Sequence, residues 1–364
     1  MKYKNKNKAI LLLQDGTVFH GKSIGFSGTK GGEICFNTGM TGYQEVYTDP
    51  SYYGQIMVNT NAHIGNYGVH PDESESDSPK IFGVVINAFS DDYSRGQAVD
   101  NLNNYLIKHE IPGICDVDTR KIVRHIRNKG AMNAIISSEI EDIDELKNEL
   151  AKVPSMEGLE LSSFVTTKKA YEMGQDGGIK LAVMDYGIKS SILKQLVQRG
   201  FRCKVFPSNA TFKDTEEWKP QAYFLSNGPG DPGVMTDAIN NSKQIIESGK
   251  PLFGICLGHQ LIALANGIKT FKMHNGHRGL NQPVLNTESG RSEITSQNHG
   301  FSIVTEDVEK SSLVVATHLN LNDNTVEGLR MKDKKVFSVQ YHPESSPGPH
   351  DSRYLFDQFI SLIN

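Results

Sequence analysis

One cysteine of the sequence stands where a nucleophile could be presented to a substrate. Cys256 lies between two glycines, Gly254 and Gly258, after an apolar run that ends at Phe253 and before a helix-like stretch, Leu261–Ala265. Glycines on both sides would allow a sharp turn from strand to helix, the arrangement called a nucleophile elbow. The partial positive charge at the helix N-terminus would favour the thiolate over the thiol. This context predicts a reactive cysteine rather than a structural one.

A histidine and a carboxylate near the end of the chain could supply the base that such a cysteine needs. The strand-like run Val336–Gln340 is soon followed by His342-Pro343-Glu344. In an extended segment His342 and Glu344 project from the same side, and Pro343 favours an extended conformation at His342. Alone, this tripeptide is more typical of a surface loop. Together with the Cys256 elbow it predicts a triad in which Glu344 orients His342.

The order of these residues resembles that of the class I glutamine amidotransferases, in which a cysteine elbow precedes a terminal His-x-Glu. The resemblance implies that Leu225–Pro232 is the oxyanion-hole loop. This loop follows the apolar run Ala222–Leu225, which we predict to be a strand, and two prolines stiffen it. Its glycines would let backbone N–H groups come close to a ligand.

The same loop also matches a dinucleotide-binding pattern. Gly228, Gly230 and Gly233 have the spacing G-x-G-x-x-G. However, Pro229 and Pro232 remove N–H donors that a pyrophosphate would need. No acidic residue closes a second strand about 20 residues later, where ribose binding requires one. We therefore exclude nucleotide binding by this loop.

Length and composition limit the alternatives. A chain of 364 residues is long enough for two domains, since one core rarely grows beyond about 250–300 residues. The net charge of -4 suggests no bias towards nucleic acid, and no apolar run is long enough for a signal peptide or a membrane span. Cys35, Cys115, Cys203 and Cys256 lie far apart, which argues against disulfides and favours a reducing, cytoplasmic location.

The elements that must position the triad lie in the second half of the chain. Predicted strands at Ile179–Asp185 and Phe201–Phe206 alternate with predicted helices at Lys189–Arg199 and Asp237–Ser248. This alternation predicts an α/β fold with a mostly parallel sheet and helices on both faces. The class I amidotransferases have this architecture, so the strand and helix pattern predicts the same fold as the resemblance implies.

The first half follows a different pattern, which predicts a separate strand-rich α/β domain. Asp15-Gly16 indicates a hairpin, Ile81–Ala88 a buried strand, and Val99–His109 and Asp118–Asn128 helices. A polar stretch after this half has the composition of a linker. The predicted division is an N-terminal domain at residues 1–166, a linker at 167–178 and a C-terminal glutaminase domain at 179–364.

Short motifs of the first half resemble the small subunit of carbamoyl-phosphate synthetase. They are Met40–Glu45, Thr48–Tyr52, His63–Asn66 and Asp118–Arg120. The segment from Tyr341 to Asp351 resembles that subunit too, so the likeness extends almost from end to end. Glutaminase domains of the anthranilate or guanylate type lack the first-half motifs. One departure is Thr60-Asn61-Ala62, where the family more often has an aromatic residue and proline, which leaves the conformation of this loop open.

The resemblance implies a role for each matching residue. Cys256 would attack the glutamine carboxamide, and backbone N–H groups of Leu257 and Gly228 would hold the oxyanion. His342, held by Glu344, would protonate the departing ammonia and then activate water to hydrolyse the thioester. Further contacts to glutamine are implied for Ser51, Gly230, Gln260, Asn298, Gly300 and Phe301.

Ser51 would come from the first domain. Without the resemblance, it would be interpreted as a turn residue after Pro50. His259, His299 and His350 also lie near the motifs, but no metal-ligand spacing connects them. We therefore expect no metal site in the chain.

The resemblance also implies a partner. The ammonia would pass to a large subunit, which makes carbamoyl phosphate from bicarbonate and two ATP for arginine and pyrimidine biosynthesis. This sequence has no G-x-x-x-x-G-K-[ST] or comparable phosphate loop. We therefore expect no cofactor in this chain, with ATP and its metal ions on the large subunit of a heterodimer.

Three other functions fit parts of the sequence. A glutaminase that serves another synthase is disfavoured by the first-half motifs. A non-catalytic scaffold with the same fold is disfavoured because Cys256, His342 and Glu344 are all present. In an α/β-hydrolase the acid precedes the histidine along the chain, whereas Glu344 follows His342. We therefore predict the glutamine-hydrolysing subunit of a carbamoyl-phosphate synthetase.

Overall fold

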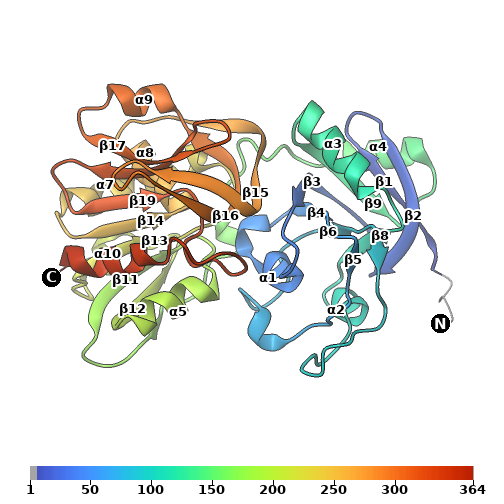
Figure 1. Cartoon of the computed structure of the whole chain (residues 1–364), viewed down its shortest axis with the longest axis horizontal. Helices are drawn as coiled ribbons and strands as arrows, with labels where there is room; N and C mark the ends of the chain where they lie inside the picture. The colour runs from blue at the N-terminus through green and yellow to red at the C-terminus, as the bar shows by residue number, and fades with distance from the viewer. Residues whose placement is uncertain (1–5, 364) are drawn as a thin grey trace. The chain divides into compact units, whose positions relative to one another are not determined.

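The computed structural model describes residues 6–363 of the chain (Figure 1). Contacts within it divide the chain into two compact units, Met1–Met156 and Glu157–Asn364. Each unit has hydrophobic clusters of its own. No helix in residues 6–363 combines the length and the apolar character that a membrane crossing requires.

The first unit is built on a closed β-barrel. Around the barrel, the strands are β1 (Lys8–Leu13), β2 (Val18–Gly25), β8 (Pro112–Cys115), β6 (Gly83–Val85), β4 (Gln55–Asn59), β3 (Thr29–Asn37) and β9 (Met132–Ser137). The pairs β3–β4, β4–β6 and β6–β8 are parallel, and the others are antiparallel. The predicted hairpin at Asp15-Gly16 is confirmed, because β1 pairs with β2 and Gly16 between them has a φ of 88°.

The first unit also contains short helices. They are α1 (Tyr43–Thr48), η1 (Pro50–Tyr52), η2 (Pro71–Glu73), α2 (Leu102–Lys108), α3 (Thr119–Lys129) and α4 (Ile143–Leu150). In α3, Ile122 and Ile126 lie one turn apart and are buried in the same cluster as Leu11 of β1. The predicted strand Ile81–Ala88 is shorter in the structure. The chain leaves the barrel after Val85, and β7 (Ala88–Phe89) pairs instead with β5 (His63–Ile64).

The second unit contains one large sheet. Its strands, in order across the sheet, are β10 (Tyr171–Met173), β12 (Phe201–Pro207), β11 (Ile179–Asp185), β13 (Ala222–Leu225), β14 (Leu252–Ile255), β19 (Val336–Val339), β18 (Val326–Met331), β17 (Val314–Asn320), β15 (Thr270–Asn286) and β16 (Arg291–Ile303). From β12 to β19 neighbouring strands are parallel, as predicted. Beyond β19 the sheet continues with antiparallel pairs, an extension that the sequence did not predict.

Helices cover both faces of the parallel strands, which confirms the predicted class (Figure 1). Leu181 and Val183 of β11 belong to a cluster with α5 (Ser190–Gln198) and α10 (Tyr354–Ile363). Ala182 and Met184 belong to another cluster, with α7 (Thr236–Glu247) and α8 (Leu257–Ala265). Alternate side chains of one strand thus pack on opposite faces. The remaining helices of this unit are η3 (Ser162–Phe164), α6 (Phe212–Glu216), η4 (Pro232–Val234) and α9 (Thr305–Lys310).

The segment that we predicted to be a linker contains the edge strand β10. Tyr171–Met173 pairs antiparallel with β12, and all three residues are exposed. Before it, Thr167 N–H donates a hydrogen bond to Asp185 Oδ2 (2.7 Å). A polar sequence suits a solvent-exposed sheet edge, which explains why composition alone resembled a linker. Contacts divide the units earlier, between Met156 and Glu157.

Candidate active site

Cys256 lies between the end of β14 and the start of α8 (Figure 1). Its φ is 53°, which residues with a Cβ rarely adopt. A Cβ on Gly258 would lie 2.2 Å from the Leu225 carbonyl oxygen, and one on Gly254 would lie 2.8 Å from that of Gly258. The two glycines therefore leave no Cβ in the way of the turn, as predicted. The cysteine itself takes the strained conformation, and the glycines let α8 pack closely on the neighbouring strands.

The thiol of Cys256 is almost completely enclosed, since the residue is 3% exposed. Its backbone N–H donates to Val339 O (2.9 Å), which ties the elbow to β19. Its Sγ lies 3.7 Å from Asn298 O, to which the thiol donates a weak hydrogen bond. Because Cys256 is the N-cap residue of α8, its side chain lies at the end of that helix where N–H groups have no helical partner.

His342 follows β19 and is held from two sides. Its backbone N–H donates to Ser296 O (2.9 Å). Its ring Nδ1 lies 2.8 Å from Glu344 Oε1, so that Nδ1–H donates to the carboxylate. The other ring nitrogen, Nε2, is buried and has no hydrogen-bond partner in residues 6–363. Cys256 lies close enough to raise the pKa of His342, so Nε2 is the nitrogen available to the thiol.

Neighbouring charges shift the pKa values of this buried pair in opposite directions. Burial lowers the pKa of His342, but Glu344 and Cys256 more than offset burial and raise it above its usual value. Burial raises the pKa of Glu344, but Lys189 and His342 lower it below its usual value. The site therefore favours an imidazolium next to a carboxylate. This is the charge state of the histidine after it accepts a proton from a cysteine thiol.

The structure adds a lysine that the sequence analysis missed. Lys189 precedes α5 and is 4% exposed. Its Nζ lies 2.8 Å from Glu344 Oε1 and 2.7 Å from Ser346 O. A buried cation requires such partners. The available signal was its position shortly after the strand Ile179–Asp185, because carboxyl ends of parallel strands meet at the same edge of a sheet.

The loop after β13 brings the predicted oxyanion groups to the elbow. Ser226 Oγ accepts a hydrogen bond from Tyr186 N–H (2.9 Å), which fixes the start of the loop. A Cβ on Gly228 would lie 2.3 Å from Tyr186 O and 2.8 Å from Leu257 Cδ2. Gly228 therefore lies directly against the residue that follows the cysteine. Gly230 has a φ of 96°, where glycine avoids the strain of a Cβ.

Three of the predicted glutamine contacts lie near the elbow on α8 and β16. Gln260 Nε2 donates to Phe301 O (2.9 Å) and to Gln340 Oε1 (3.0 Å). Asn298, through its carbonyl oxygen, accepts the hydrogen bond of the Cys256 thiol. Gln260, Asn298 and Phe301 are therefore brought together around the cysteine.

Gly300, also on β16, lies between two cations. A Cβ there would lie 3.2 Å from a terminal guanidinium nitrogen of Arg278 and 3.3 Å from Lys272 Nζ. Lys272 Nζ also lies 4.9 Å from the centre of the Phe301 ring. The sequence analysis did not predict either cation. Their charge would attract a substrate carboxylate.

Ser51 is the predicted contact that belongs to the first unit. It lies in η1, where its backbone N–H donates to Asp49 Oδ1 (2.9 Å). This local bond fits the turn role that its position after Pro50 also suggested. A contact between Ser51 and glutamine stays a prediction.

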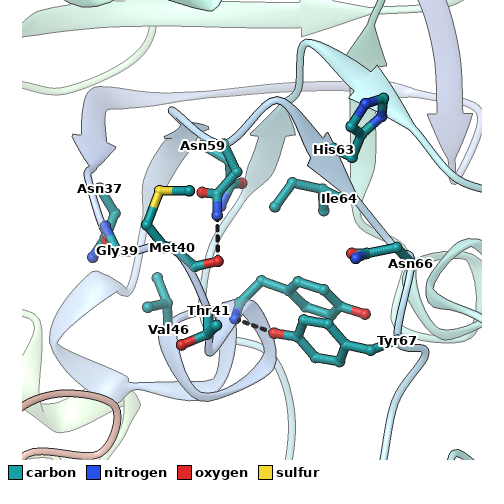
Figure 2. Close-up of a pocket in the computed structure, with 12 residues that line it drawn as sticks. Asn37, Gly39, Met40, Thr41, Val46, Asn59, His63, Ile64, Asn66 and Tyr67 are labelled. Carbon is teal, nitrogen blue, oxygen red and sulfur yellow. Dashed lines mark hydrogen bonds between the residues drawn. The ribbon is translucent and has the colours of Figure 1, made fainter. Parts of the chain in front are cut away.

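Motif residues of the first unit line one pocket (Figure 2). The motif residues among its lining are Met40, Thr41, Tyr43, His63, Ile64 and Asn66. The Tyr67 hydroxyl accepts hydrogen bonds from the backbone N–H groups of Gly42 and Tyr43 (2.9 Å each). Asn61 Nδ2 donates to Met40 O (2.7 Å). The segment Thr60-Asn61-Ala62, which departs from the family pattern, therefore supports the wall of this pocket.

Comparisons with known proteins cover both units. Residues 182–362 match the profile of the family described as glutamine amidotransferase class-I, and residues 11–136 match that of carbamoyl-phosphate synthase small chain, CPSase domain. A Nostoc protein named carbamoyl phosphate synthase small chain is 47% identical over 368 residues, which cover 97% of this chain and 94% of that protein. A protein of the same name from Solidesulfovibrio magneticus is 45% identical and covers 98% of each chain.

Proposed function

The chain belongs to the family of carbamoyl phosphate synthase small chains, and from this premise we propose that it releases ammonia from glutamine with a Cys256-His342-Glu344 triad. The observation that supports the triad most directly is the buried 2.8 Å contact between His342 Nδ1 and Glu344 Oε1. It leaves the other nitrogen of the ring to the cysteine at the elbow. All three residues lie in the part that matches the glutamine amidotransferase profile.

In the first half of the proposed reaction, His342 Nε2 takes the thiol proton and Cys256 Sγ attacks the carboxamide carbon of glutamine. Backbone N–H groups of Leu257 and Gly228 stabilise the oxyanion of the tetrahedral intermediate. His342 then protonates the departing nitrogen. Ammonia leaves, and a glutamyl thioester stays on the enzyme.

In the second half, a water molecule gives a proton to His342 Nε2 and attacks the thioester carbon. The intermediate collapses, Cys256 leaves as thiolate and recovers the proton, and glutamate is released. Glu344 keeps the ring oriented and stabilises its cation. Lys189, 2.8 Å from Glu344, keeps that carboxylate anionic.

The residues that would hold the substrate are those that the family resemblance implied. We assign contacts to glutamine to Ser51, Gly230, Gln260, Asn298, Gly300 and Phe301. Lys272 and Arg278, which flank Gly300, add positive charge on the same strand pair. A free amino acid presents one carboxylate, so cations beside this strand favour its binding.

The proposed reaction makes ammonia for a partner. We propose that a large subunit combines it with bicarbonate and two ATP to form carbamoyl phosphate, in a cytoplasmic heterodimer that supplies arginine and pyrimidine biosynthesis. ATP and its metal ions would bind the large subunit, and this chain would need no cofactor of its own. The names of the full-length relatives support a small-chain role of this kind.

Replacing the nucleophile tests the proposal. In the complex with the large subunit, we expect Cys256→Ser to abolish glutamine-dependent carbamoyl phosphate synthesis and to preserve ammonia-dependent synthesis, because added ammonia bypasses the missing step. Cys203→Ser is the matched control, since Cys203 is buried in the same apolar cluster. Loss of both activities in a folded Cys256→Ser protein, or equal loss in Cys203→Ser, would contradict the assignment.

A further inference from the structure

Metal-ligating side chains outside the triad meet in the antiparallel part of the sheet. His277 on β15, His299 on β16 and Glu327 on β18 each place a ligand atom within 4.8 Å of the others. Glu327 is fully buried, and the side chains of His299 and His277 are 2% and 11% exposed. His277 and His299 are opposite each other in the β15–β16 pair, whereas Glu327 comes from a strand further along the chain. Sequence spacing therefore did not reveal the cluster.

The far nitrogen of each histidine has an oxygen partner. His277 Nε2 lies 2.8 Å from Asp323 Oδ2, and His299 Nδ1 lies 2.8 Å from Phe301 O. In the neutral tautomer with its proton on this far nitrogen, each ring presents a lone pair on the near nitrogen. Histidines that bind metals in proteins almost always have this kind of oxygen partner on the other nitrogen. The two rings are therefore arranged as metal ligands would be.

The carboxylate of Glu327 has an unsatisfied oxygen. Its Oε1 accepts a hydrogen bond from Asn320 Nδ2 (3.2 Å), but Oε2 has no hydrogen-bond partner in the described part of the chain. An unpaired buried carboxylate oxygen is costly, and such groups are uncommon in folded proteins. A cation bound beside Glu327 would remove this cost.

We propose that His277, His299 and Glu327 form a binding site for a divalent metal ion of the zinc class. Two imidazole nitrogens and one carboxylate oxygen suit such an ion, with water as a fourth ligand. In a tetrahedral zinc site with bonds of about 2.0–2.1 Å, neighbouring ligand atoms lie roughly 3.3 Å apart. Here Glu327 Oε1 lies 3.1 Å from His277 Nδ1 and 3.9 Å from His299 Nε2. Small side-chain movements would complete the site.

Two side-chain amides lie next to the histidine nitrogens that would bind the ion, and the ion would displace both of them. Gln297 Oε1 lies 3.1 Å from His299 Nε2, and a metal ion would displace this amide oxygen from the nitrogen. Asn320 Nδ2 lies 3.3 Å from His277 Nδ1, and would have to turn away.

The competing occupant of the cluster is a proton. Burial lowers the pKa of His277, but hydrogen bonds to Asp323 and Glu327 more than offset burial and raise it to about 9. The alternative to a metal site is therefore an ion pair network in which protonated His277 lies between Asp323 and Glu327. The experiment must therefore measure metal binding itself.

The test uses the full-length chain with Cys256→Ser, so that the elbow thiol cannot act as a metal ligand. After treatment with a chelator, this parent is titrated with Zn²⁺ by calorimetry and with Co²⁺ by visible absorption. We expect one saturable equivalent in the parent. Added Glu327→Gln or His277→Gln should weaken binding at least tenfold. The Asp323→Asn change, which alters only an outer partner, should weaken binding about tenfold.

A matched histidine provides the control. His318 is buried in the same sheet but lies outside the cluster, so His318→Gln should bind Zn²⁺ like the parent. Zn²⁺ should also raise the unfolding temperature of the parent and not that of the Glu327→Gln variant. If the buried variants do not fold, Asp323→Asn, at an exposed carboxylate, still decides the question.

Absence of saturable binding in the parent would overturn the proposal and leave an ionic cluster. Unchanged affinity in the folded cluster variants, including Asp323→Asn, would overturn it as well. None of these measurements uses glutamine hydrolysis, so a negative result would leave the proposed glutaminase function untouched.

Discussion

Two cysteines of the second unit share one apolar cluster and have very different surroundings. Cys203 lies inside β12, is fully buried, and has a thiol pKa that burial raises to about 12. Cys256 belongs to the same cluster but lies beyond the end of β14, with a φ of 53° and His342 close by. Burial alone therefore does not determine what a thiol can do. The carboxyl end of a parallel strand adds a helix N-terminus and charged neighbours from adjacent strands.

Two histidines show the same contrast. His259, inside α8, is fully buried, and burial lowers its pKa to about 3. Its ring Nδ1 lies 2.9 Å from the hydroxyl of Ser338. His342 is almost as buried, but it faces the carboxylate of Glu344, and its pKa is raised instead. In this pair, the histidine at the strand end faces a charged partner, whereas the histidine inside the helix faces a neutral one.

The largest effect that this contrast predicts is on catalysis. His342→Asn should slow glutamine hydrolysis by at least the roughly 10²–10⁴-fold that positioned proton transfer contributes. His259→Asn should lower stability and leave the rate of the folded enzyme within a few-fold of the parent. The measurement is steady-state glutaminase activity at matched folded concentrations. A comparable loss in folded His259→Asn would break the contrast.

The next effect concerns the thiols themselves. In the folded chain, Cys256 should react with iodoacetamide at least ~10²-fold faster than Cys203, because a thiol with a pKa of about 12 is about 10⁻⁴ ionised at pH 8. Peptide mass spectrometry over time gives both rates in one sample. In 6 M guanidinium the two rates should converge, which controls for intrinsic reactivity. Similar rates in the folded protein would mean that the elbow does not activate Cys256.

The candidate site could be predicted only where its residues share local patterns. Cys256 stands out through its glycines, and His342 and Glu344 through their spacing around a proline. Lys189 has only its position after a predicted strand as a signal, and its contact with Glu344 joins segments far apart in the second unit. The elbow was predicted, but the strained backbone conformation of Cys256 itself was not.

The fold shows the same limit. The strand Ile179–Asp185 was predicted with the bounds that β11 has, because its apolar run is continuous. The closed barrel, the edge strand β10 and the antiparallel ribbon β15–β16 were not predicted. The barrel and the edge strand depend on which distant segments pair, and the side-chain alternation within one strand does not identify the partner strand.

A smaller effect should follow from removing the buried lysine. Lys189→Met keeps most of the side-chain length but removes the cation 2.8 Å from Glu344. We expect kcat for glutamine hydrolysis to fall, but by less than the roughly 10²–10⁴-fold predicted for His342→Asn, because all three triad residues are still present. Lys194→Met, at an exposed position of the same helix α5, is the matched control. An unchanged kcat in Lys189→Met would remove Lys189 from the positioning role.

The smallest effect is on stability, where the two histidines should show opposite pH trends. His342 has a folded pKa above its usual 6.5, so its contribution is fully present below pH 6.5 and is lost as pH rises towards the folded pKa. His259 has a folded pKa of about 3, so its contribution is present above pH 6.5 and is lost as pH falls below that value.

Each trend can change the free energy of unfolding by at most about 1.4 kcal/mol per pH unit. In a domain of 150–250 residues, each kcal/mol shifts the unfolding temperature by about 2–4 °C. Unfolding temperatures of the parent, His342→Asn and His259→Asn between pH 5 and 8 test this. The gap between the parent and His342→Asn should narrow as pH rises, whereas the gap between the parent and His259→Asn should widen up to about pH 6.5. If the unfolding temperatures of both variants stay a constant distance from those of the parent over this pH range, the two surroundings do not shift the histidine pKa values in opposite directions. The comparison would then fail.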